Sequence, residues 1–537
     1  MPKVPPPRRP GSVSNTASTL CHMGTEALIR GVRLVPAFAG HPGDAPIPAG
    51  EAGTPVDVRV ADGLIAEIGP RLTRRGEPTY DGGGRPLMPG LWDRHVHMSQ
   101  WVSGALRLRT SGARDADEAC ALVREAVAAL PPGATLQGFG HRLARWPRPP
   151  SVAALDAVSG DHPVILISGD AHHGWLNSAA LRLLGLPPRQ GVVAEAEWFS
   201  LFPRLAELPG AADASEAAYP AVVAAAHALG VVGIGDMEFA DNRLAWPARA
   251  QGGRATPPVD TIRVRAAVYP ADLAGALAAG VRTGDPLPGG HGLVEMGPLK
   301  IISDGSLNTR TAWCCAPYAD AEETTQAPYG ARNLPLPELI DLLRRARAGG
   351  LEVAVHAIGD RAVAEALDAF EATGAKGTIE HAQLMRRGDL ARMARLGVGA
   401  SVQPAHLLDD RDVSERCWPD RSDRCFPLRG LRDAGVRLLL GSDAPVAHLD
   451  PWLAMAAAVH RSGDERAPWH PEQSLRTAEA LQASTNGVRL AVGERADLLL
   501  LEADPLAVPD DSREAAAALR EVAVAATFVA GRCVYAA

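Results

Sequence analysis

The chain has 537 residues, 46% of them hydrophobic, so it can bury a large core and exceeds the size of one average domain. Its formal net charge of -8 excludes a typical nucleic-acid binder, whose phosphate contacts need a basic surface. No run of about 18 uninterrupted apolar residues is present, so we expect no membrane span. The seven cysteines are odd in number and lack CxxC spacing, which predicts reduced thiols and a cytoplasmic protein.

The two ends of the chain differ from its middle. Residues 1–24 have the composition of a disordered tail without the apolar core of a secretory signal, and Met23 is an alternative start. Strand-like segments follow within 25–88, and two of them are joined by a short glycine-containing connection that suits a β-hairpin. Similar strands return only within 486–537. We therefore expect one small β domain, a sandwich, built from both ends.

The middle, residues 89–485, alternates strands with helices rich in Ala, Leu and Arg. This alternation predicts an α/β fold of the (β/α)8 type, a TIM barrel of eight parallel strands. The strand candidates are 92–97, 231–236, 262–268, 293–302, 351–357, 377–382, 398–403 and 436–442. Residues 98–230 are too many for a simple connection between the first two strands, so we interpret them as an insertion, a candidate lid.

Metal-binding residue types stand at the ends of these strands. His95 and His97 are two apart in a strand, so they present two imidazoles to one face. The carboxyl ends of barrel strands form one active-site face, where Lys300, His356, His381 and Asp443 would join them. Lys300 is one of only three lysines in the chain and lies inside an apolar strand, which favours a chemical role for its amine.

Seven motifs occur in one order along the chain. They include Pro-Gly-x-x-Asp-x-His-x-His at 89–97, Ile-Glu-His-Ala-Gln at 379–383 and Gly-Ser-Asp-x-Pro at 441–445. The others lie at 170–178, 300–306 with 310–312, 356–361 and 401–406. With these motifs the chain resembles the amidohydrolase superfamily over about residues 26–537, and within it the branch that includes N-substituted formamide deformylases.

The resemblance implies a TIM barrel, a composite β-sandwich and a site for two zinc ions. One metal ion would be held by His95, His97 and Asp443, and the second by His356 and His381. Lys300 would bridge the two as a carbamate formed with carbon dioxide, because an unmodified ammonium group has three donors and no acceptor. A divalent metal lowers the pKa of bound water from 15.7 to about 7, so the nucleophile would be a metal-bound hydroxide. Asp443 would also carry a proton to the leaving nitrogen.

Substrate contacts are expected from three further places: the segment after the seventh strand, the insertion, and the motif that contains Arg310. Gln403 and His406 follow the seventh strand, where the histidine would polarise a scissile carbonyl or bond to a loop. The insertion contributes residues that either contact substrate or pack a lid on itself. The candidate substrate-binding residues are His172, Trp175, Asn177, Arg310, Gln403 and His406.

These inferences predict a metal-dependent hydrolase that cleaves a non-peptide C–N bond in a small molecule, such as an N-formyl or N-acyl amine. A deaminase or another acyl-bond hydrolase of the same superfamily is the alternative reaction, although deaminases usually lack the bridging lysine. A non-catalytic assembly subunit is the alternative of another class, but such relatives lose ligands and all six candidates are present here. The metal's identity and the formation of a homo-oligomer are left open by the sequence.

Overall fold

A computed structural model describes residues 26–39, 54–141, 143, 146–168, 173–194, 197–198, 201, 204–205, 208–253, 256–321 and 327–537. The expected tail at 1–24 and the alternative start Met23 lie outside these residues. Two compact units are present. The first unit comprises the described residues of Met1–Met98, Val223–Gly252 and Pro258–Ala537, and the second those of Ser99–Val222 and Gly253–Pro257.

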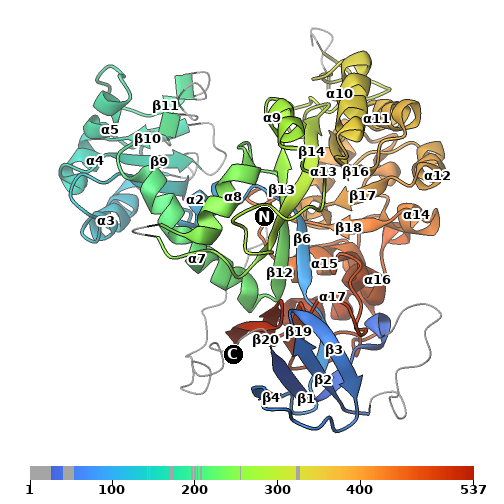
Figure 1. Cartoon of the computed structure of the whole chain (residues 1–537). Coiled ribbons are helices and arrows are strands. Elements are labelled where there is room, and N and C mark those ends of the chain that lie inside the picture. Colours follow the sequence, from blue (N-terminus) through green and yellow to red (C-terminus); the bar gives the residue numbers. More distant parts are fainter. Residues whose placement is uncertain are drawn as a thin grey trace. The chain divides into compact units, whose positions relative to one another are not determined.

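The first unit contains a sheet of eight parallel strands, in the order β18-β17-β16-β15-β14-β13-β12-β6 (Figure 1). Its strands are β6 (Leu91–Val96), β12 (Val231–Asp236), β13 (Arg263–Val268), β14 (Val294–Ile302), β15 (Val353–Ala357), β16 (Gly377–His381), β17 (Gly399–Val402) and β18 (Leu438–Leu440). The two outer strands meet where Asp443 N donates to His95 O at 2.7 Å and His97 N donates to Ala444 O at 2.8 Å. The predicted parallel barrel is thereby confirmed as a nearly closed one.

Helices follow the barrel strands along the chain. They are α8 (Asn242–Gln251), α9 (Leu273–Ala279), α10 (Leu336–Ala348), α11 (Asp360–Thr373), α12 (Arg387–Leu396), α13 (Leu407–Cys417), α14 (Leu428–Asp433) and α15 (Pro451–His460). In α11, apolar residues at helical spacing are buried, and the helix stops at Gly374, whose φ of 62° is left-handed. Most residues of the barrel strands are buried, and most strands are mainly apolar, as is usual for a parallel sheet with both faces covered. The polar residues that interrupt these strands therefore need partners.

A second sheet in the same unit joins strands from both ends of the chain, in the order β21-β20-β19-β5-β1-β2-β3, with β4 paired to β1. The blue and red strands in Figure 1 are these two sets. They are β1 (Ala27–Leu34), β2 (Val56–Ala61), β3 (Leu64–Gly69), β4 (Thr79–Asp81), β5 (Pro86–Pro89), β19 (Leu498–Leu501), β20 (Val524–Val529) and β21 (Arg532–Ala536). The antiparallel pair of β2 and β3 is the predicted hairpin. The sandwich and the domain boundaries at 25–88, 89–485 and 486–537 stay predictions.

Short helices complete the first unit: η1 (Pro36–Phe38), η4 (Pro404–His406), η5 (Ser422–Arg424), η6 (Pro471–Gln473), α16 (Thr477–Ala483) and α17 (Ser512–Glu521). The η elements are single 3-10 turns. The most important of them for the site is η4, because it follows β17 directly and contains His406.

The second unit has its own five-stranded sheet, in the order β11-β10-β9-β8-β7. Its strands are β7 (Leu108–Arg109), β8 (Leu136–His141), β9 (Val164–Ser168), β10 (His173–Leu176) and β11 (Val193–Ala194), and its helices include α2 (Met98–Ala105), α3 (Ala116–Val127), α4 (Val152–Ser159) and α5 (Ser178–Leu183). Helix α7 (Ala211–Ala228) runs from this unit into the first. Side chains of α3 and α4 pack with Trp146 and Trp175 in a buried apolar cluster. The predicted role of residues 98–230 as a lid stays a prediction.

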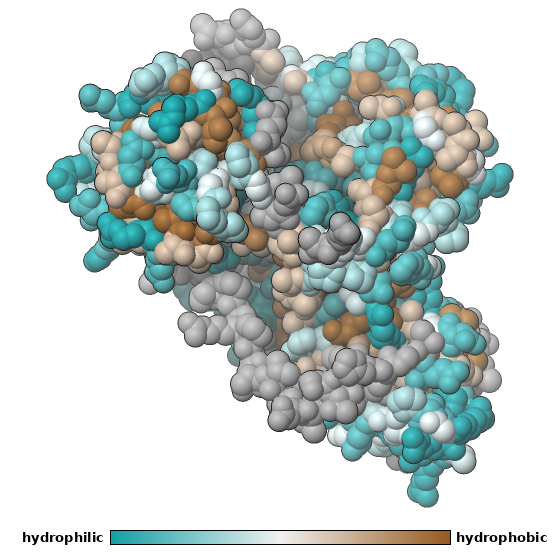
Figure 2. Space-filling view, turned by 60° about the vertical axis from the view of Figure 1, so that its left-hand side comes forward, coloured by the Kyte–Doolittle hydropathy of each residue, from teal (hydrophilic) through white to brown (hydrophobic). Residues whose placement is uncertain are grey.

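Hydrophilic side chains cover much of the face drawn in Figure 2, and apolar ones gather there in small separate patches. Among the described residues, none of the helices combines the length and the apolar character that crossing a bilayer requires.

Candidate metal centre

The barrel collects the predicted ligands at the carboxyl ends of its strands. His95 lies in β6, Lys300 in β14, His356 in β15 and His381 at the end of β16. His97 directly follows β6, and Asp443 lies shortly after the end of β18. Parallel strands place all their carboxyl ends on one side of the barrel, so residues more than 300 positions apart can meet there. Neighbouring backbones come close at this point, since a Cβ on Gly441 would lie 2.8 Å from His95 N.

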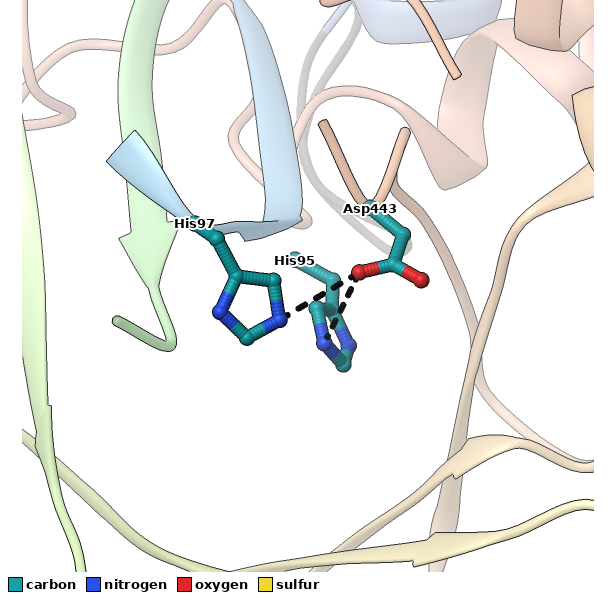
Figure 3. Close-up of side chains that lie close together, drawn as sticks. All are labelled: His95, His97 and Asp443. Atoms are coloured by element: carbon teal, nitrogen blue, oxygen red, sulfur yellow. Dashed lines mark ion pairs between the residues drawn. The ribbon is translucent and has the colours of Figure 1, made fainter. Parts of the chain in front are cut away.

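The first cluster is formed by His95, His97 and Asp443 (Figure 3). Asp443 Oδ1 lies 3.6 Å from His95 Nε2 and 3.4 Å from His97 Nε2, and the three ligand atoms are all within 4.8 Å of one another. Donors that each lie about 2.0–2.2 Å from a tetrahedral zinc ion are separated from one another by about 3.3–3.6 Å. The spacing of this cluster therefore fits one divalent metal ion.

A second cluster shares the same carboxylate. His381 and His406 each bring one ring nitrogen within 4.8 Å of the other ligand atoms, and His406 Nε2 lies 3.8 Å from Asp443 Oδ2. His356 has its ring centroid 4.5 Å from that of His381, but its Nε2 lies 3.3 Å from Gly305 O. This leaves Nδ1 as the nitrogen of His356 that a metal ion could use. The resemblance implied that His356 and His381 hold the second metal ion. This cluster instead groups His381 with His406, which the sequence analysis placed among the substrate contacts.

The Lys300 amine lies among these ligands. Its Nζ is 3.2 Å from His95 Nε2, and the residue is 2% exposed. Burial lowers the pKa of Lys300, against the opposing charges of Glu380 and Asp443. A lysine that loses its proton readily can react as an amine, which is what carbamate formation requires. The carbamate itself stays a prediction.

Three of the histidines are held in the form that binds metals. Burial lowers the pKa of His95 and His381, and it lowers that of His356 to about 3. Neutral imidazole has a free nitrogen lone pair, so these rings are suited to ligation at neutral pH. Burial opposes the ionisation of Asp443, but His95, His97 and the neighbouring histidines hold its pKa below the ordinary value. His95, His356 and His381 therefore offer neutral imidazoles beside an anionic carboxylate.

Two of these residues have unusual backbone conformations. His381 has φ of 71° and Asp443 has φ of 59°, both in the left-handed region that side-chain-bearing residues seldom adopt. Such conformations cost of order 1–3 kcal/mol each and persist only where the surrounding structure holds them. Asp443 is held by its N–H bond to His95 O and by accepting an N–H bond from Val446. The fold thus maintains strained backbone where the ligands converge.

Three buried carboxylates outside the predicted ligand set support the site. Glu380, 1% exposed, has Oε2 2.7 Å from His95 Nδ1, an arrangement that fixes the proton on Nδ1 and leaves Nε2 for a metal ion. Asp93 Oδ1 accepts N–H bonds from His95 and Ser442, which ties β6 to the segment after β18.

Asp304 is the third of these carboxylates. It accepts N–H bonds from Trp313, Ile358 and Gly359, and its Oδ1 lies 3.4 Å from His356 Nε2. The signal that could have revealed Asp93, Asp304 and Glu380 is their place in or directly beside apolar strands, because a carboxylate buried there must be paired or hydrogen-bonded.

The predicted substrate-binding residues have different surroundings. Gln403 is 1% exposed and donates from Nε2 to Ser401 O, and within the described structure its Oε1 has no hydrogen-bond partner. Arg310 forms an ion pair of 2.7 Å with Asp320 and donates to Asn308 O. Gln403 therefore keeps an unused acceptor, whereas the guanidinium of Arg310 is already paired.

The insertion residues are used inside the second unit. Trp175 is fully buried, and its Nε1 donates to Ser151 O at 3.0 Å. Asn177 Oδ1 accepts N–H bonds from Val164 and Ala180, which caps α5, and its Nδ2 donates to Ser159 Oγ. These contacts fit the alternative prediction, in which the insertion packs on itself and does not contact substrate. His172 lies outside the described residues.

Known proteins resemble this chain over most of its length. It is 27% identical over 522 residues to an N-substituted formamide deformylase from Arthrobacter pascens, covering 88% of this chain and 94% of the relative. It is also 27% identical over 532 residues to the protein LONG AFTER FAR-RED 3 of Arabidopsis thaliana, covering 89% and 88%. A crystal structure of an uncharacterised metal-dependent hydrolase from Pyrococcus furiosus has a TM-score of 0.72 at 24% identity, over 90% of this chain and 100% of that one.

The similarity to the Pyrococcus furiosus structure shows the fold alone, because the two sequences are only 24% identical. A model of the amidohydrolase family matches residues 79–535, which include the barrel, all six predicted ligands and the returning C-terminal strands. The match confirms the resemblance drawn from the seven motifs. The chain belongs to the amidohydrolase family and is a metal-binding hydrolase.

Proposed function

We propose that this hydrolase cleaves the C–N bond of a small N-formyl or N-acyl amine, with two divalent metal ions, zinc by preference, as cofactors. His95, His97 and Asp443 would hold the first ion, and His381 with His356 or His406 the second. The proposal is carried by one observation: the Asp443 carboxylate has two histidine nitrogens near Oδ1, at 3.4 and 3.6 Å, and a third 3.8 Å from Oδ2. The Lys300 amine, 3.2 Å from His95 Nε2, supports the proposal of a bridging carbamate.

The bound metal would supply Lewis acidity, making water a nucleophile near neutral pH and polarising the substrate carbonyl. The chain's own residues would supply proton transfer and orientation. Asp443 is the carboxylate suited to accept the proton of the attacking water and return it to the leaving nitrogen, because Glu380 is bonded to His95 and Asp93 to two backbone N–H groups.

The groups after β17 would orient the substrate. Gln403 Oε1, which lacks a hydrogen-bond partner within the described structure, can accept an amide N–H bond. His406 Nε2, also without a hydrogen-bond partner there, can bind a metal ion or donate to the scissile carbonyl according to its tautomer. The name of the Arthrobacter pascens relative, N-substituted formamide deformylase, supports the choice of an amide-type C–N bond.

The test is to measure metal content and to assay a panel of N-formyl and N-acyl amines before and after chelation. We expect about two metal ions per chain, loss of activity on chelation, and its return with zinc, manganese or cobalt. Full activity in a metal-free preparation would overturn the mechanism. Release of ammonia from amidines or heterocycles, without hydrolysis of acyl amines, would instead identify a deaminase.

The Lys300 carbamate has its own test. Lys300→Arg keeps the charge but cannot form a carbamate, so we expect loss of the second metal ion and of most activity. Lys300→Ala should fail as well, but the smaller side chain leaves room for added formate or acetate to take the bridging place and restore part of the activity. Two metal ions and near-normal turnover in Lys300→Arg would show that no carbamate bridges the site.

A further inference from the structure

Three aromatic rings stand in a row beside the first metal cluster. Phe239 follows β12, Tyr269 follows β13, and His97 follows β6, and these three strands are neighbours in the barrel sheet. The ring centroids of His97 and Phe239 are 5.2 Å apart with 17° between their planes. Those of Phe239 and Tyr269 are 5.0 Å apart with 29° between their planes. The row therefore begins at a predicted metal ligand and leads away from it.

Hydrogen bonds fix the backbone around Phe239, but much of the residue is exposed. Its N–H donates to Glu238 Oε1 at 2.9 Å, and Glu238 N in turn donates to Asp236 Oδ1. The hydroxyl of Tyr269 donates to Met237 O at 2.8 Å, which fixes the same segment from the next strand. In spite of these bonds, 62% of Phe239 remains exposed. This large aromatic side chain is therefore accessible to a ligand or to solvent.

A second exposed apolar residue lies on the other side of β6. Val446 is 67% exposed, three positions after Asp443, and its N–H donates to Asp443 O at 2.8 Å. The segments after β12 and β18, the two strands next to β6, thus each present an apolar side chain close to the ligands His97 and Asp443. Phe239 and Val446 have no side-chain polar atoms, so they favour an uncharged substituent.

We propose that Phe239 and Tyr269 form an aromatic subsite that binds a planar aromatic substituent on the substrate. The inference rests on the proposed function, since the scissile C–N bond would lie at the metal cluster from which the row of rings begins. The near-parallel rings favour a flat group over a saturated one of the same size, because aromatic pairs gain about 0.5–1.5 kcal/mol beyond the area they bury. Phe239 is accordingly a specificity-determining residue.

The experiment compares two N-formyl amines that differ only in a phenyl or a cyclohexyl group, together with a third that carries an alkylammonium group. We expect wild-type kcat/KM to favour the phenyl substrate by about 2- to 13-fold over cyclohexyl, which corresponds to 0.5–1.5 kcal/mol at 1.36 kcal/mol per tenfold. Phe239→Ala should bring this ratio close to one, and Phe239→Tyr, which keeps the ring, should preserve it.

Leu244→Ala is the matched control, because Leu244 is also 62% exposed but lies on α8, outside the row of rings. It should leave the ratio and the metal content unchanged. Equal kcat/KM for phenyl and cyclohexyl in the wild type, or an unchanged ratio in Phe239→Ala, would overturn the subsite. Preference for the ammonium substrate would overturn it in favour of cation binding. Loss of metal from Phe239→Ala would show that the ring only supports His97.

Two failures can be told apart in this experiment. If wild-type enzyme loaded with metal hydrolyses none of the acyl amines, the proposed function is wrong and the subsite falls with it. If it hydrolyses the phenyl and cyclohexyl substrates equally well, only the aromatic subsite is wrong.

Discussion

The metal cluster of the barrel and the pair Trp175 and Asn177 of the second unit both contain motif residues, but their polar atoms differ in hydrogen bonding. In the described structure His97 Nδ1, His381 Nδ1, His406 Nε2 and Gln403 Oε1 are buried without hydrogen-bond partners. Asn177, by contrast, accepts two N–H bonds and donates two, and Trp175 Nε1 is bonded to Ser151 O. Sequence motifs alone did not distinguish these two situations.

The difference follows from the cost of burying polar groups. A buried donor or acceptor without a partner costs about 1–3 kcal/mol, so a fold does not keep several of them together without a compensating gain. Where every atom is satisfied by the chain, as around Asn177, the residue stabilises the fold. Where a buried nitrogen lies near a carboxylate and has no hydrogen-bond partner in the described structure, as His406 Nε2 does near Asp443 Oδ2, a ligand is expected to complete it.

The largest effect should come from the carboxylate shared by the two clusters. Asp443→Asn removes the anionic ligand and the proposed proton carrier together, so we expect loss of bound metal and a fall in kcat/KM of at least about 1,000-fold. Metal analysis and single-substrate kinetics would measure both. Asp389→Asn is the control, since Asp389 is also a buried carboxylate but is paired with Arg386. Retention of metal by Asp443→Asn would contradict the assignment of the clusters.

The second-largest effect should come from Trp175 in the second unit, and it should be an effect on stability. Trp175→Ala leaves a large cavity in the apolar cluster with Trp146, so we expect the free energy of unfolding of the second unit to fall by about 3–5 kcal/mol. Metal content should not change. Denaturant unfolding followed by tryptophan fluorescence, together with metal analysis, would check this. A stable variant with altered substrate selectivity would restore the substrate contact predicted from the sequence.

The barrel and the convergence of five candidate ligands were predictable because most of its strands are apolar runs with a polar residue near the end. All eight strand candidates form strands, and His95, His97, Lys300, His381 and Asp443 converge as the strand pattern implied. The partnership of Glu380 with His95 was not predicted, since strand periodicity gives the face on which a residue lies but not the side chain that it meets. The same holds for the grouping of His406 with His381, which depends on the turn η4 rather than on strand periodicity.

Glu380 offers a smaller and more selective test of the metal cluster. Glu380→Gln keeps the size of the side chain but weakens its hold on His95 Nδ1–H, so we expect metal affinity to fall by about 10- to 100-fold with little loss of stability. Competition with a chelator of known affinity would measure it. Glu479→Gln is the matched control, because Glu479 is a buried glutamate bound by Arg429. Equal metal affinity in the two variants would leave Glu380 with a packing role only.

The smallest effect should appear at Arg310, which the motif placed among the substrate contacts and the structure pairs with Asp320. Both side chains are partly exposed, at 33% and 23%, so the ion pair should contribute at most about 1 kcal/mol to the free energy of unfolding. If the pair is the whole role of Arg310, then Arg310→Met and Asp320→Asn should destabilise the protein equally, the double variant should be no worse than either, and KM should stay constant. A double-mutant cycle with steady-state kinetics tests this. A rise in KM confined to the variants that lack Arg310 would place its guanidinium on the substrate, and the site would then extend from the metal clusters to the loop after β14.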